Sequence, residues 1–149
     1  MKTITLSKSE FLKKDSLEGL YNECKVWLSG IELCLVELKF TKSIFDQYFS
    51  DIATIHKLGE LDLIEKELSN SFIKLNNAHT KIRTQEKQVF EIIENEFSHD
   101  EQAFRDQHEK LKETIESTQN EIKGIKKKVF SFTEETMRKK KKKEKRFIR

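Results

Sequence analysis

The chain of 149 residues contains no proline and only four glycines. Proline interrupts helices, and glycine is the usual residue of tight turns, so their scarcity argues against a fold rich in strands and turns. Charged residues make up 37% of the chain. Such a composition is typical of long, uninterrupted helices. We therefore expect an all-α protein.

Cysteine is also scarce, and Cys24 and Cys34 are the only two. On one helix their backbones would lie roughly 15 Å apart, which is too far for a disulfide. We therefore expect a reducing, cytoplasmic setting. The N-terminus lacks the apolar core of a signal peptide. The most apolar window, residues 26–40, contains Glu32 and Glu37 and is too short to cross a bilayer.

Motifs that carry chemistry are missing as well. The sequence has no glycine-rich phosphate loop, no Cys-x-x-Cys pair and no Gly-x-Ser-x-Gly nucleophile elbow. Both cysteines occupy apolar helical positions, where thiols behave as small hydrophobic groups. We expect a non-enzymatic protein with no cofactor and no small-molecule substrate.

What the sequence does contain is helical periodicity. Steps of three and four residues from Leu17 to Ile55 meet an apolar or aromatic residue at eleven of twelve positions. A seam of this length predicts a helix that packs like a coiled coil. The residues expected to form an interaction seam on this helix are Trp27, Ile31, Leu35, Leu38 and Phe45.

Apolar residues also flank this seam on both sides. Leu28, Leu35 and Phe49 lie on one flank, and the other flank carries Val26, Leu33 and Phe40. A helix that is apolar on more than one stripe is expected to contact two neighbours. A second copy of the chain would supply the additional neighbour, so we expect self-association or a protein partner.

Two turn signals divide the rest of the chain. Residues 56–60 end in a basic turn followed by Gly59, where a left-handed C-cap is expected. Ser98 and Glu101 have the spacing of a capping box, and apolar steps continue between and beyond these turns as far as Thr136. Three helices of about 40 residues, each roughly 60 Å long, would follow. Short turns then predict an elongated up-down-up three-helix bundle of antiparallel, coiled-coil-like helices.

The expected domain organisation has three parts. Residues 1–15 form an N-terminal segment that is frayed or a short helix, and residues 16–137 form the helical bundle. Residues 138–149 form a basic C-terminal tail that is disordered or extends the last helix. This tail carries nine Lys or Arg and one Glu, which gives +8 and leaves −5 on residues 1–137 of a chain whose net charge is +3.

Polar residues interrupt the seams at one level. If the second turn lies near residue 98, His108 faces the region of Glu86, and Gln85 and Trp27 come to the same level. The interpretation that we favour is a polar layer that fixes helix register. The alternative is a metal site, because helical bundles hold metals with Glu and His side chains. Its candidate ligands are Glu86, Glu101, His108 and His99.

The basic tail has several interpretations. A run of like charge is often only a solvated, solubilising segment. It could instead bind the phosphates of a nucleic acid or ribosome, an anionic membrane surface, or an acidic protein. The candidate anion-binding residues are Arg138, Lys139, Lys140, Lys141, Lys142, Lys143, Lys145 and Arg146.

Two stretches resemble a loose group of small, uncharacterised all-helical bacterial proteins. They are the residues from Trp27 to Leu33, and Asn70-Ser71-Phe72-Ile73. Gly30 departs from that pattern, in which a polar or charged residue is expected. The resemblance implies a helical bundle and no site residues. The residues themselves favour a non-enzymatic scaffold or protein-interaction module; the alternatives are a nucleic-acid or ribosome-associated protein and a metal-binding bundle.

Overall fold

The computed structural model describes residues 8–95 and 101–147, with side chains described for residues 17–94 and 102–146. Within these ranges the chain is almost entirely helical and has no strand, which confirms the all-α prediction. The helices are α1 (Lys8–Gln47), α2 (Phe49–Ala53), α3 (Leu58–Asn95) and α4 (Glu101–Phe147). The described part therefore has four helices where three were expected, because the short α2 stands between the first two long ones.

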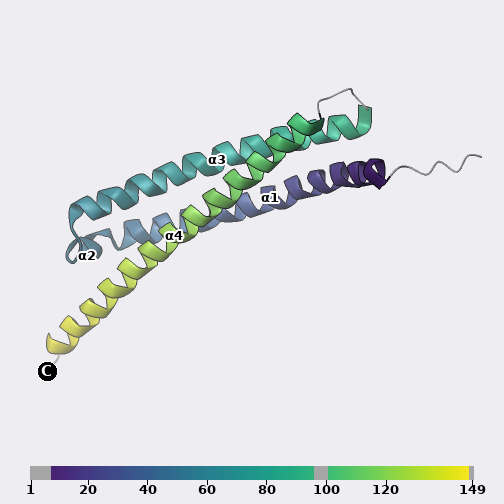
Figure 1. Ribbon diagram of the computed structural model, residues 1–149. Coiled ribbons are helices and arrows are strands. Elements are labelled where there is room, and N and C mark those ends of the chain that lie inside the picture. The colour runs from purple at the N-terminus through teal and green to yellow at the C-terminus, as the bar shows by residue number, and fades with distance from the viewer. Residues whose placement is uncertain (1–7, 96–100, 148–149) are drawn as a thin grey trace, which may run out of the picture.

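The three long helices contact one another in every pairwise combination. Figure 1 shows α3 running back alongside α1, while α4 returns in the direction of α1 and extends past α2 at the C-terminal end. The molecule is consequently elongated. Its side-chain core is a column between the three long helices rather than a compact centre.

The buried positions follow the heptad pattern. On α1 every seventh residue is fully buried, from Cys24 through Ile31, Leu38 and Phe45 to Ile52. On α4 the expected steps are also borne out, with buried residues recurring at intervals of three and four from Phe104 to Val129. These helices form because apolar side chains at this spacing share one face, and burying that face stabilises the bundle.

The first turn differs from the prediction. Gly59 does not cap a preceding helix, because it lies inside the first turn of α3. The chain turns earlier, after α2, where the amides of Ile55 and His56 donate to the carbonyl of Ile52. The carbonyl of Lys57 accepts the first amides of α3. A break at Tyr48 and a second one at residues 54–57 thus replace the single glycine stop.

The second helix has a wetter seam than its neighbours, as expected. Ser71 and Gln85 are each 3% exposed and occupy seam positions of α3, whereas Phe72 is only partly buried. The second turn, including Ser98 of the expected capping box, lies outside the described residues. Glu101 is the first residue of α4, and its side chain also lies outside the described part.

The ends of the expected bundle are continuous with its helices. Residues 8–15 belong to α1, and residues 138–147 belong to α4. None of the described helices is long and apolar enough to cross a membrane.

Candidate functional site

The outer face of α1 carries a second apolar row, which we call the outer stripe. It consists of Val26, Leu33, Val36 and Phe40, whose exposed fractions are 69%, 58%, 64% and 61%. Their spacing of seven, three and four residues is that of a coiled-coil seam. The outer stripe therefore has the pattern of a helix-packing surface and is not covered by the rest of the described chain.

Other exposed apolar residues do not form such a row. Leu63 and Ile73 on α3 are 51% and 58% exposed, with Lys66 and Asn70 at the intervening seam-like positions. Single exposed hydrophobic residues of this kind are common on protein surfaces. The regular spacing is what distinguishes the outer stripe.

One edge of the outer stripe carries charges that alternate in sign. Lys25, Glu32, Lys39 and Asp46 follow one another at intervals of seven residues, and all four are exposed. This edge faces α3, because Glu32 Oε1 lies 3.4 Å from His79 Nε2. We call these four residues the charged edge.

The opposite edge of the outer stripe faces α4. Gly30 lies against Gln119, to whose Nε2 an added Cβ would approach within 3.2 Å. Glu37 forms an ion pair with Lys126 of α4. A side chain at position 30 would crowd Gln119, so the small residue allows close approach of α1 and α4.

The expected interaction seam lies inside the bundle. Ile31, Leu38 and Phe45 are 0% exposed. Leu35 packs against the same core, and Trp27 stacks on His108 with ring centroids 4.6 Å apart. These five residues hold α1 to α3 and α4, so the surface that they leave for a partner is the outer stripe.

A polar layer around His108 connects all three long helices. His108 Nε2 lies 2.9 Å from Glu23 Oε1 of α1, and His108 Nδ1 lies 3.2 Å from Gln85 Nε2 of α3. An imidazole with its proton on Nε2 satisfies both contacts, because it donates to the carboxylate and accepts from the amide. Trp27 covers the ring by stacking. The layer is a fully paired network at one level of the core.

The composition of this layer differs from the expected one. Gln85 contacts His108, whereas Glu86 is one residue away from the buried seam positions of α3. Glu23, which was not expected, supplies the carboxylate. Its only signal in the sequence is its position next to the seam residue Cys24, which leaves the carboxylate partly exposed at the edge of the core.

The metal hypothesis gains no support from the described residues. They contain no group of three or more His, Cys, Asp or Glu side chains close enough to share a metal ion. His99 and the side chain of Glu101 lie outside the described part. His108 has its two nitrogens in contact with Glu23 and Gln85, which accounts for both of them without a metal.

Both cysteines are free thiols on α1. Burial, with smaller contributions from the carboxylates of Glu86 and Glu23, raises the pKa of Cys24 to about 12. Burial, followed by the carboxylate of Glu37, also raises the pKa of Cys34. The thiolate is the nucleophilic form, so both environments disfavour reactivity. Neither cysteine has the environment of a catalytic nucleophile.

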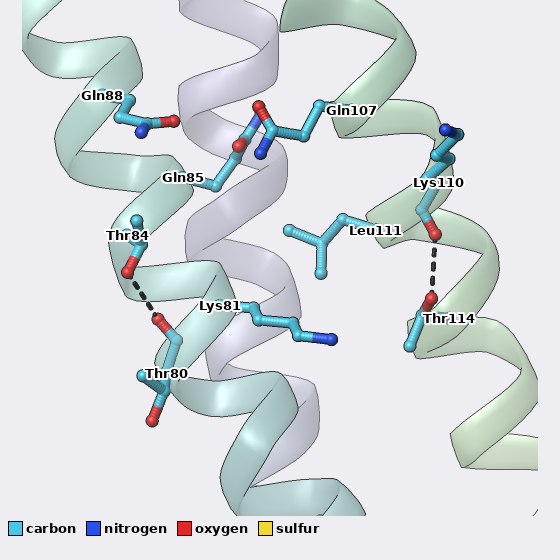
Figure 2. A pocket seen from close by; sticks show the side chains of 9 residues that line it. All are labelled: Thr80, Lys81, Thr84, Gln85, Gln88, Gln107, Lys110, Leu111 and Thr114. Carbon is cyan, nitrogen blue, oxygen red and sulfur yellow. Dashed lines mark hydrogen bonds between the residues drawn. The ribbon is translucent and has the colours of Figure 1, made fainter.

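A shallow groove of about 330 Å³ lies between α3 and α4. Figure 2 shows Gln85 and Gln107 extending toward each other from the two helices, with Lys81 reaching across the groove. The hydroxyls of Thr84 and Thr114 donate to the carbonyls of Thr80 and Lys110. These hydroxyls are thus engaged by their own helices, and the groove offers mainly long, flexible amide and ammonium groups.

A second histidine lies at the opposite end of the bundle. The rings of His56 and Phe132 are stacked with centroids 3.9 Å apart, and the carboxylates of Glu60 and Glu135 lie 3.4 and 3.3 Å from the two imidazole nitrogens. The Nε2 atom is buried, and its approach to Glu135 lacks hydrogen-bond geometry. His56 therefore joins the first turn to α4 mainly by stacking.

The basic end of α4, which we define as residues 138–146, is helical and exposed along its whole length. Its first turn still contacts the bundle, since Lys140 Nζ lies 3.6 Å from Asp51 Oδ2 and Lys139 Nζ lies 3.4 Å from Glu135 Oε1. Successive helical residues are about 100° apart, so the run from Lys141 to Arg146 presents positive charge on every side. All eight predicted anion-binding residues thus lie on one projecting helix.

No family model, no curated protein and no solved structure matches this chain at a significant level. What the chain does must therefore be argued from its own residues.

Proposed function

We propose that this chain is a non-enzymatic interaction module that binds an α-helix of its partner along the outer stripe. The observation that carries the proposal is the regular spacing of four large apolar side chains, each more than half exposed. Full burial of one such side chain contributes about 1.5–3 kcal/mol. A helix with a complementary seam is the partner that fits this spacing.

The rest of the molecule is a support for that surface. We take α1, α3 and α4 as an up-down-up three-helix bundle in which α2 is part of the first turn. The inner seam of α1 is used by the bundle, so the outer stripe is held on a rigid helix. Such rigidity lowers the entropic cost of binding.

A non-enzymatic role is supported by the chemistry of the candidate sites. The groove between α3 and α4 presents hydroxyls that are bonded to their own helices, and both thiols have raised pKa values. The two free cysteines also support a reducing, cytoplasmic setting.

The proposal predicts that polar substitution of the outer stripe abolishes helix binding. The probe is a labelled synthetic peptide helix with leucine at its a and d positions and Glu or Lys elsewhere. The wild type should associate with itself, bind this peptide, or both. Leu33→Gln with Val36→Gln should weaken either association at least tenfold, because about 2 kcal/mol of apolar burial is removed. Sedimentation velocity and fluorescence anisotropy measure the two associations.

The matched control carries Leu63→Gln with Ile73→Gln, which changes two similarly exposed apolar residues on α3. It should behave as the wild type does. A wild type that neither self-associates nor binds the peptide would overturn the proposed function, as would equal weakening in both variants.

A second function is favoured by the basic end of α4, which projects from a body with a charge of −5. We propose that it anchors the protein to a nucleic acid by contacting phosphates. A helix that is basic on every side carries no selective face, so it would give affinity without base recognition.

Neutralising the projecting charges should remove this binding. The variant changes Lys141, Lys142, Lys143, Lys145 and Arg146 to glutamine, which preserves helix propensity. Its control changes five exposed lysines of the body to glutamine: Lys66, Lys81, Lys87, Lys110 and Lys127. Binding to labelled single- and double-stranded nucleic acid is measured at low and physiological salt. The salt slope should fall by about 0.7–0.9 for every phosphate that the variant fails to neutralise. Salt-independent binding, or equal weakening in both variants, would contradict an anchor at this end.

A further inference from the structure

We propose that the helix covering the outer stripe is α1 of a second copy of this chain, packed antiparallel about a two-fold axis between residues 34 and 35. This inference rests on the proposed function, because it names the partner of the same surface. The stripe is short and has polar or small residues at its limits, with Asn22 before it and Gln47 after it. A two-fold axis at its centre lets the same short stripe serve both copies.

The apolar residues are complementary in this register. In an antiparallel pair, residues whose numbers add up to 69 lie at the same level. Leu33 then packs against the partner's Val36, and the partner's Leu33 packs against Val36. Farther out, Phe40 lies over the partner's Ser29, where a large side chain meets a small one. Alternation of large and small residues across facing positions is what allows close packing.

The charged edge supports the same register independently. Antiparallel packing brings the charged edges of the two copies together on one side of the interface. Lys25 then lies beside the partner's Asp46, and Glu32 lies beside the partner's Lys39. Because helical side chains tilt toward their own N-terminus, the members of each pair lean toward one another. The two-fold axis repeats both pairs, so every charge on this edge meets its opposite.

A parallel pair lacks this complementarity. In a parallel coiled coil, each residue of this edge meets the residue five positions later on the opposite edge of its partner. Glu32 would then face the partner's Glu37, and neither Lys25 nor Lys39 would meet a carboxylate. The two Phe40 rings would also occupy a single layer. Charge and size together favour the antiparallel pair.

The remaining edge of the outer stripe is compatible with the pair. Glu37 approaches its symmetry copy across the axis, but its charge is balanced by Lys126 of the same chain. Gly30 adds no side chain on this edge. Since α3 and α4 pack on the inner face of α1, the outer stripe is open to the partner.

Charge reversal tests the register. Lys39→Glu places two like-charged pairs in the dimer and should weaken dimerisation about tenfold. Glu32→Lys should do the same. The double variant with both changes restores opposite charges and should return to within about threefold of the wild type. Lys66→Glu, on the exposed face of α3, is the control and should leave the dimer unchanged. Sedimentation velocity across micromolar to submillimolar concentrations gives the dissociation constants.

Cysteine cross-linking tests the orientation. A mixture of a Val26→Cys chain and a Ser43→Cys chain should form a mixed disulfide under mild oxidation, since 26 and 43 share a level in the antiparallel register. Each variant alone should cross-link poorly, and the wild type under the same oxidant controls for Cys24 and Cys34. Rapid linkage of Val26→Cys with itself, or no effect of charge reversal, would overturn the antiparallel register. A monomeric wild type that binds the peptide helix would overturn self-pairing and leave the proposed function intact.

Discussion

Replacing Phe45 with alanine is expected to lower the free energy of unfolding by about 3–5 kcal/mol. The ring of Phe45 is 0% exposed in the core and packs edge to face against Phe49, with centroids 5.6 Å apart. Truncation removes the transferred apolar surface and leaves a cavity, and it also removes the contact that ties the end of α1 to α2. Urea denaturation followed by circular dichroism measures the effect, which should shift the midpoint without changing native helicity much.

The matched control is Phe40→Ala on the same helix. Phe40 is 61% exposed, so at protein concentrations where the chain is monomeric its removal should cost less than about 0.5 kcal/mol. The two substitutions delete the same atoms five residues apart and differ only in the face of α1 that they affect. Similar destabilisation by both would show that α1 does not bury the face described above.

Replacing His108 with alanine is the second large change, with an expected cost of about 2–4 kcal/mol. The substitution removes the contacts with Glu23 and Gln85 and the stacking partner of Trp27. It leaves the amide of Gln85, which is 3% exposed, without the imidazole partner. An unpaired buried amide costs more than the average hydrogen bond contributes, because its desolvation is not offset.

A double variant separates the two parts of this cost. His108→Leu with Gln85→Leu replaces the polar layer by an apolar one and should be clearly more stable than His108→Ala. His79→Ala is the control, because His79 is partly exposed and contacts only the exposed Glu32 at 3.4 Å. It should cost less than about 1 kcal/mol. If the double variant were as unstable as His108→Ala, the unpaired amide would not be the cause.

The regular parts of the fold could be predicted because their cause is local and repetitive. On α4 the step pattern identifies the buried face from Phe104 to Val129, since helix geometry alone places residues at this spacing on one face. The first turn could not be placed in this way. Glycine permits a turn without requiring one, and at Gly59 the hydrogen bonds from Lys57 begin a new helix instead. The short α2 has no periodic signal of its own.

The candidate site shows the same division. The sequence places Trp27 and His108 at one level, because both lie on seams whose register follows from the turns. It does not identify Glu23, whose position depends on the rotation of α1 about its axis, or the choice of Gln85 over Glu86. The outer stripe could be recognised as a second apolar row. Which of the two rows faces inward depends on how α3 and α4 pack against α1.

The length of α4 has a consequence for the paired molecule. Its basic end continues past the turn between α2 and α3, where Lys140 lies 3.6 Å from Asp51. An antiparallel pair through α1 would place the two basic ends at opposite poles of one rod, on the order of 90 Å apart at the helical rise of 1.5 Å per residue. A rod with two such poles is bivalent toward a polyanion, so it would bridge distant segments or separate molecules. Binding would then compact or cross-link a long nucleic acid, whereas a short oligonucleotide would occupy only one pole.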